Sequence, residues 1–244
     1  MAELIKARVD VIVATGDLPI RTAQQATTTI AILGIGQDLV GSGFVNSLAR
    51  PGGNTTGVDT LAANLDGKRQ EILIETIPGI RRIAALVDSR NTPPRRLQEL
   101  QDDTRGRGVE LSIHKIARPQ EIPAAIDAAK ASGAEGLNVL SSPLLVGNRA
   151  VIIQRVAALR LPTIYQYPEE AEEGGFIGYG SRLVPTYREL LGPQLVKLLR
   201  GAKPADLPIE QPTKFELVVN LKTANALALE VPESFLARAD KVIE

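Results

Sequence analysis

Short apolar runs rich in β-branched residues recur along the chain, and each ends in a small polar loop that leads into a helical stretch. The clearest runs are Val9–Ala14, Ile30–Ile35, Ile83–Val87 and Leu137–Leu140. Strands that alternate with helices predict a parallel sheet, and ligands of open parallel sheets bind beyond the carboxyl ends of the strands. The alternation therefore predicts an α/β protein whose loops form a binding cleft.

Size and composition permit one large domain or two smaller lobes. The chain has 244 residues, 44% of them hydrophobic, which is enough for substantial cores. Lys+Arg 28 balance Asp+Glu 28 without a dense basic run, so nucleic acid and anionic membranes are not expected partners. Because cysteine is absent, disulfides and thiol chemistry are excluded.

Targeting and membrane-spanning segments are not recognisable. The apolar runs are shorter than the roughly 18 residues that cross a bilayer. The first residues, Met1–Arg8, lack the apolar core of a signal peptide. On the residues alone we expect no export, so the chain as written could remain cytoplasmic.

Helices are predicted where stretches begin near proline or end against glycine. They are Pro19–Thr27, Gly41–Ala49, Leu65–Ile77, Pro93–Gly106, Pro119–Ser132, Val146–Leu159 and Pro185–Leu199. Arg50–Asn54 is expected to be a tight turn, and Lys203–Pro208 an extended break. A single sheet of all these strands would be wide, so two lobes are predicted, with Gly174 and Gly175 near the return to the first lobe.

The loops lack the motifs of enzymes, nucleotide sites and metal sites. Gly34 and Gly36 follow a strand, but the third glycine of a dinucleotide fingerprint would fall at Leu39. His114, the single histidine, is expected on a strand facing solvent, where it can serve neither a metal cluster nor a serine nucleophile. We therefore expect no catalytic residue, cofactor or metal ion, and no enzyme activity.

Hydrogen-bonding groups and a few charges are what the loops offer instead. A helix N-terminus presents free N–H groups, so amides after three loops could hold a carboxylate: Thr15–Gly16, Gly36–Gln37 and Ser141–Ser142. Three aspartates in these and similar loops could face an ammonium group, or each could cap the following helix: Asp17, Asp38 and Asp88.

The four tyrosines cluster in one window of the chain. They are Tyr165, Tyr167, Tyr179 and Tyr187, in a sequence without tryptophan. An aromatic ring with a phenol at the rim suits a partly apolar ligand, and the alternative is packing near a connection between lobes. Tyr165, at the end of a predicted strand, is the preferred candidate for binding, whereas Tyr187 is expected to pack on its helix.

Several motifs taken together resemble those of the ABC transporter substrate-binding proteins often called tryptophan/tyrosine-type. The resemblance covers essentially the whole chain. The motifs are Val9–Ala14, Gly41–Gly43, Leu48–Gly57, Gly67–Arg69, Asn148–Arg149, Glu173–Gly175, Gly201–Pro208 and Pro212–Phe215.

The resemblance implies two doubly wound, Rossmann-like parallel-sheet lobes in the type I periplasmic binding protein fold. By analogy, residues 1–62 and 174–202 form lobe 1, and residues 63–173 and 203–244 form lobe 2. The ligand cleft is expected between the lobes, which close by a hinge. Residues carried over as ligand-binding are Thr15, Gly16, Asp38, Thr56, Asp88, Ser141 and Tyr165.

The resemblance also implies a function, partners and a location. It predicts a periplasmic or extracytoplasmic protein that binds a small organic solute, an aromatic or branched amino acid being suggested, and delivers it to ABC permease subunits without chemistry. The alternative is an effector-binding domain of a transcription regulator, since the same fold serves there, although no helix-turn-helix segment is recognisable.

Two departures from the family pattern carry expectations of their own. Relatives usually read Asp-Pro in the second loop, where this chain has Asp38 and Leu39. Relatives also carry an export signal and two strand–helix units before the equivalent of Val9, so lobe 1 is expected to be N-terminally truncated. The strand Val9–Ala14 would then be an open edge, which predicts poor solubility or dimerisation through that edge.

Overall fold

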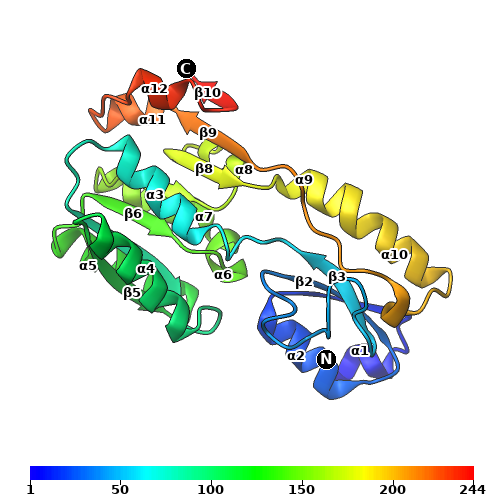
Figure 1. Ribbon diagram of the computed structural model, residues 1–244. Coiled ribbons are helices and arrows are strands. Elements are labelled where there is room, and N and C mark those ends of the chain that lie inside the picture. The colour runs from blue at the N-terminus through cyan, green and yellow to red at the C-terminus, as the bar shows by residue number, and fades with distance from the viewer. The chain divides into compact units, whose positions relative to one another are not determined.

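The computed structural model describes residues 1–244 and divides into two compact units (Figure 1). Unit 1 comprises Met1–Ala63 and Leu183–Thr213, and unit 2 comprises Asn64–Arg182 and Lys214–Glu244. Both are built on mainly parallel sheets with helices against them, so the predicted α/β class is confirmed.

Unit 1 holds a three-stranded parallel sheet in the order β1-β2-β3, formed by β1 (Val11–Thr15), β2 (Ala31–Gly36) and β3 (Thr55–Asp59). Separate apolar clusters form around Ile32 and around Leu33, whose side chains alternate between the two faces of β2. The other elements are α1 (Ala2–Lys6), α2 (Asp17–Ala26), α9 (Leu183–Pro185), the π-helical segment η2 (Thr186–Leu191), α10 (Gly192–Leu199) and η3 (Pro204–Asp206).

Unit 2 holds a seven-stranded sheet in the order β10-β9-β8-β7-β6-β4-β5, parallel except where β8 meets β9. The strands are β4 (Arg82–Asp88), β5 (Glu110–Ile116), β6 (Gly136–Val139), β7 (Thr163–Tyr165), β8 (Ile177–Gly180), β9 (Glu216–Asn220) and β10 (Lys241–Ile243). Nearly every residue of the central strands is buried, as expected of a sheet covered on both faces.

Helices of unit 2 pack into two separate apolar clusters. One cluster joins the sheet to α3 (Asp66–Thr76), α4 (Pro94–Gly106), α11 (Leu221–Ala226) and α12 (Glu233–Leu236). The other joins it to α5 (Ile122–Ala131), α6 (Pro143–Gly147) and α7 (Arg149–Ala158). The short η1 (Pro119–Glu121) and α8 (Pro168–Glu172) complete the unit. This unit is therefore doubly wound.

The boundaries of the two units differ from those expected for the two lobes. Residues 174–182 were assigned to lobe 1, but β8 pairs with β7 and β9 and so belongs to unit 2. Residues 203–213 were assigned to lobe 2, but the Thr56 hydroxyl donates to the Leu207 carbonyl (2.7 Å) and Ile209 packs in the core of unit 1. Strand pairing therefore assigns residues 174–182 to unit 2, and hydrogen bonding and side-chain burial assign residues 203–213 to unit 1.

One predicted helix, Gly41–Ala49, is wrong. This segment consists of turns, because the Asp38 carboxylate accepts a hydrogen bond from the Gly41 amide (2.8 Å) and Gly43 has a φ of +71°, outside the helical region. Two glycines also weaken any helix here. The loop after β2 is consequently held by side-chain hydrogen bonds.

Candidate functional site

Buried polar side chains gather at the carboxyl ends of β4, β6 and β7, which are neighbours in the sheet of unit 2. Asp88 ends β4, and its carboxylate accepts hydrogen bonds from the Ser142 hydroxyl (2.7 Å) and the Arg90 amide (3.0 Å). The Ser142 amide in turn donates to the Gln166 side chain (3.2 Å). Three loops that are distant in sequence are thereby joined at one edge of the sheet.

A buried ion pair at the start of α3 supports these loops. The Arg69 guanidinium pairs with Asp66 and also donates to the Ser141 hydroxyl (2.7 Å) and the Tyr179 carbonyl (3.2 Å). The Asp66 carboxylate accepts from the Ser141 amide (3.2 Å) and hydroxyl (3.1 Å). Because burying charges is costly unless they are paired and hydrogen-bonded, this network fixes the Ser141 loop firmly to α3.

A second guanidinium reaches the same carboxylate from α4. Arg96 Nη2 lies 3.0 Å from Asp66 Oδ2, so that two arginines share one aspartate. The Arg69 side chain is fully enclosed, whereas 20% of the Arg96 side chain is exposed. The buried Arg96 Nε has no hydrogen-bond partner.

Glu170, on α8, is a buried carboxyl group of unit 2. Its Oε2 accepts a hydrogen bond from the Tyr167 amide (2.9 Å). Burial raises the pKa of Glu170 to about 8, although the Tyr167 amide and the charges of Arg69 and Arg149 act in the opposite direction. At neutral pH this carboxyl group is therefore mostly protonated.

The carboxyl ends of the unit 1 strands carry three aspartates. Asp59 ends β3 and accepts from the Leu39 amide (3.0 Å) and the Leu61 amide (3.1 Å), while the Ser42 hydroxyl donates to Asp17 (3.0 Å). Burial raises the pKa of both carboxyls, and the charge of the exposed Asp38 adds to this. This edge favours a cation over an anion.

The predicted ligand-binding residues are divided between the two units. Asp88 and Ser141 come together in unit 2, where Asp88 binds Ser142 and Ser141 binds the α3 ion pair. In unit 1, Thr15 is exposed at the end of β1, Gly16 caps α2 and Asp38 is exposed in the following loop. For all of them, ligand contact stays a prediction.

The other two predicted ligand-binding residues are enclosed. Thr56 lies inside β3 with its hydroxyl bound to the Leu207 carbonyl. Tyr165 is fully buried in an apolar cluster beside Gly175, where a Cβ would approach its ring to 2.5 Å. Burial raises the pKa of the Tyr165 phenol well above its usual value. Neither side chain reaches solvent in this structure.

In one of the three loops whose backbone amides were expected to hold a carboxylate, Ser141–Ser142, the amides are already engaged. The Ser141 amide donates to Asp66, and the Ser142 amide donates to Gln166. Sequence reasoning missed Asp66, Arg69 and Arg96 as site residues, although Gly67–Arg69 stood out as a motif. Their contribution depends on α3 and α4 meeting β6, which no local pattern reveals.

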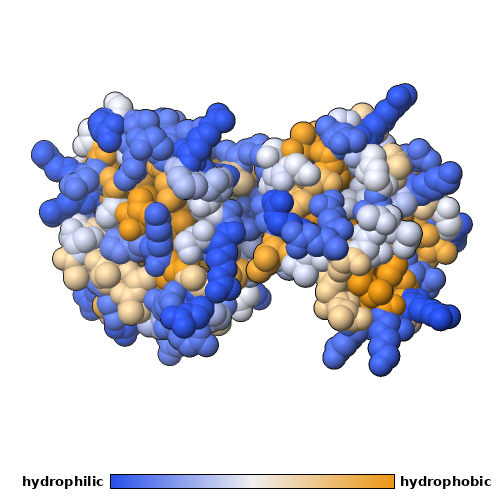
Figure 2. Space-filling view, turned by 90° about the horizontal axis from the view of Figure 1, so that it is seen from below, coloured by the Kyte–Doolittle hydropathy of each residue, from blue (hydrophilic) through white to orange (hydrophobic).

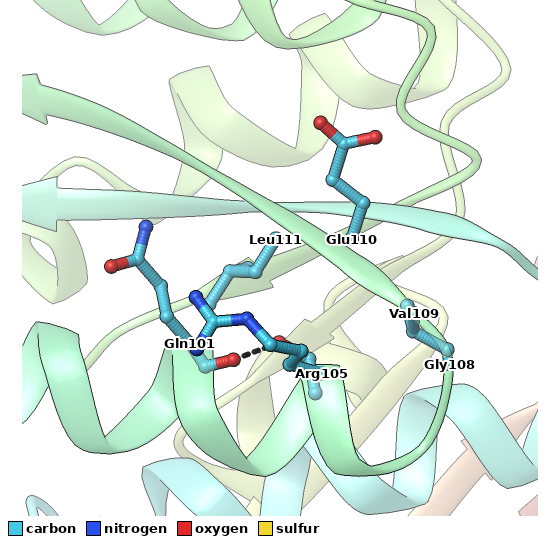
Figure 3. Close-up of a pocket in the computed structure, with 7 residues that line it drawn as sticks. Gln101, Arg105, Gly108, Val109, Glu110 and Leu111 are labelled. Carbon is cyan, nitrogen blue, oxygen red and sulfur yellow. Dashed lines mark hydrogen bonds between the residues drawn. The ribbon is translucent and has the colours of Figure 1, made fainter.

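A pocket of about 320 Å³ lies elsewhere in unit 2 (Figure 3). It lies where the end of α4 meets the start of β5, and Gln101, Arg105 and Leu111 are among its lining residues. This is the amino end of β5, opposite the end at which the polar loops gather. We therefore do not associate this pocket with the candidate site.

No helix combines the length and apolar character needed to cross a membrane. No group of three or more His, Cys, Asp or Glu side chains is arranged to hold a metal ion. The site therefore offers hydrogen bonds and paired charges.

Solved structures share this fold at low sequence identity. A Streptococcus pneumonia ABC domain in complex with L-Trp has a TM-score of 0.82 and 23% identity, over 96% of this chain and 81% of that one. A conserved domain protein from Vibrio cholerae O1 biovar El Tor has a TM-score of 0.84 and 22% identity, over 98% and 80%. A putative LacI-family repressor from Corynebacterium glutamicum has a TM-score of 0.56 and 15% identity, over 86% and 77%.

A comparison with curated protein sequences found no match. The family model described as ABC transporter substrate binding protein, in contrast, matches residues 1–243. This match confirms the resemblance seen in the sequence, and with it the type I periplasmic binding protein fold. The family is one of solute-binding proteins that act outside the cytoplasm. The chain belongs to the ABC transporter substrate-binding protein family.

Proposed function

We propose that the chain is the solute-binding component of an ABC uptake transporter and that its solute is an amino acid. The observation that carries the proposal is Asp88, a carboxylate that is 5% exposed and forms no ion pair. A buried carboxylate without a counter-ion is costly, and a bound ammonium group would offset that cost. Asp88 ends a strand of a parallel sheet, where solutes of such folds bind.

The neutral hydrogen-bonding groups beside Asp88 fit a binding role without chemistry. Ser142 and the Arg90 amide orient the carboxylate. No cluster of side chains that could hold a metal ion accompanies it. The single histidine, His114, lies on the edge strand β5 opposite Leu86 of β4, and its ring nitrogen bonds the Ser112 hydroxyl (3.1 Å).

The Streptococcus complex with L-Trp supports an amino acid as the solute class. The proposed partners are the permease subunits of an ABC transporter in the membrane, and the proposed location is the periplasm or its extracytoplasmic equivalent. That one solute touches both units, in a cleft closed by a hinge, stays a prediction. A regulator domain is the weaker alternative, because its support is fold likeness at 15% identity.

A thermal-shift screen of L-amino acids, including L-tryptophan, beside sugars such as D-arabinose tests the proposal. A solute at 100 times its dissociation constant should stabilise the protein by about 2.7 kcal/mol. We expect at least one amino acid to raise the unfolding midpoint by several degrees and the sugars to leave it unchanged. If sugars shift the midpoint and no amino acid does, the amino-acid assignment is wrong.

A further inference from the structure

We propose that the Arg96 guanidinium binds the carboxylate of the solute, which makes Arg96 a specificity-determining residue. This rests on the proposed function in so far as the solute is an amino acid. The site would then bind both charged groups of an α-amino acid. Asp88, at the end of β4, would contact the ammonium group, and Arg96, in the first turn of α4 after the next loop, would contact the carboxylate.

The first argument is charge. Arg69 and Arg96 share the Asp66 carboxylate, so the three side chains carry one surplus positive charge. An anion bound here would compensate that surplus in a poorly hydrated environment, where a charged hydrogen bond is strong.

The second argument is access. Arg69 is fully enclosed, and its guanidinium donates to Asp66, Ser141 and the Tyr179 carbonyl. Arg96 is partly exposed, uses Nη2 for Asp66, and keeps a buried Nε without a hydrogen-bond partner. An arginine fork binds a carboxylate through two parallel N–H groups. Of the two arginines, Arg96 alone has surface available for a solute.

The third argument is that neighbouring acidic groups and backbone amides do not compete with the contact between Arg96 and a solute carboxylate. Asp88 is bound by the Ser142 hydroxyl and the Arg90 amide. Glu170, whose charge acts on Arg69 when ionised, is mostly protonated at neutral pH because burial raises its pKa to about 8. The amides of Ser141 and Ser142, which were among the expected carboxylate ligands, donate to Asp66 and Gln166.

The test uses the full chain with arginine labelled by ¹⁵N and follows the Nε–Hε resonances by NMR while sodium acetate is added at constant ionic strength. The Arg96 resonance is assigned by its loss in Arg96→Lys. We expect acetate to shift it saturably, and in Arg96→Gln we expect acetate to shift none of the remaining arginine Nε–Hε resonances saturably. The matched control is Arg95→Gln, whose side chain is 90% exposed and pairs with Glu99 on the same helix.

A second arm compares the amino acid with the largest shift in the screen against its decarboxylated amine. We expect Arg96→Gln to weaken the amino acid by about 10- to 100-fold and the amine little. Arg96→Lys should restore part of the affinity, and Arg95→Gln should change neither.

The outcomes separate the two proposals. If an amino acid binds but neither it nor acetate moves the Arg96 resonance, and Arg96→Gln binds within twofold of the wild type, this inference is wrong and the proposed function stands. If acetate binds at Arg96 and no amino acid binds, the inference stands and the amino-acid function fails. Should Arg96→Gln not fold, the wild-type resonance still decides.

Discussion

Glu170 makes the stability of the protein depend on pH through a single buried side chain. Its folded pKa is about 8, above the ordinary value of 4.5, so the folded state holds a proton that the unfolded chain releases. The stabilisation is present below about pH 4.5 and is lost as pH rises to about 8. Each pH unit in that window removes on the order of 1 kcal/mol of unfolding free energy.

Glu170→Gln should flatten this dependence. Glutamine keeps an acceptor for the Tyr167 amide but cannot ionise. The unfolding free energy of the variant, relative to that of the wild type, should therefore rise by several kcal/mol between pH 5 and pH 8. Urea unfolding at pH 5, 6, 7 and 8 measures the difference. Glu230→Gln, at an exposed position, should parallel the wild type, and a parallel curve for Glu170→Gln would show that Glu170 is ionised in the folded protein.

At the scale of residues, the sequence predicted loop side chains better than their supports. Asp88 and Ser141 could be proposed because each follows a recognisable strand, and the structure does bring their loops together. Arg69 and Arg96 could not, because their positions depend on the packing of α3 and α4. Tyr165 has the right place in sequence, but the alternation of a strand turns its ring into the core.

Among the elements, β1 leaves part of the sheet of unit 1 unprotected. It pairs only with β2, so it is an edge strand, as predicted for this run. Its buried residues Ile12 and Ala14 alternate with Val13, which is 50% exposed. Apolar patches interrupt the polar surface of the molecule (Figure 2). Unpaired edge strands with exposed apolar side chains favour pairing with another chain.

We therefore expect concentration-dependent dimerisation, and Val13→Lys should reduce it because a charge on the edge opposes strand pairing. Sedimentation velocity between low and high micromolar concentrations measures the association. Val151→Lys, at a 42% exposed position on α7 of unit 2, should dimerise like the wild type. A wild-type protein that stays monomeric throughout would refute pairing through β1.

β3 depends on one close backbone approach. Gly57 has a φ of +149°, and a Cβ at this position would lie 1.8 Å from the Gly34 carbonyl oxygen of β2. Gly57→Ala should therefore lower the unfolding free energy by about 3–5 kcal/mol, since backbone atoms must move. Gly147→Ala, with open space at its Cβ, is the control, and chemical denaturation compares them. Equal stabilities would contradict this geometry.

Over the whole molecule, the alternation of strands and helices was sufficient to predict the fold class. Short buried runs bounded by polar loops specify parallel strands locally, and both sheets follow that pattern. The division into units was harder to predict, because the chain crosses between them at residues 63/64, 182/183 and 213/214. The last two crossings depend on the pairing of β8 with β9 and the packing of residues 203–213 on unit 1, which are long-range contacts.

The central claim is that an amino acid binds at the carboxyl edge of the unit 2 sheet through Asp88. Isothermal titration of the amino acid selected in the screen into wild type, Asp88→Asn and Asp103→Asn tests it most directly. Asp103 is an exposed aspartate of α4 and serves as the matched control. We predict that Asp88→Asn weakens binding at least 10-fold, because it removes the counter-charge of the ammonium group, while Asp103→Asn binds like the wild type. Equal affinities for all three proteins would contradict the account.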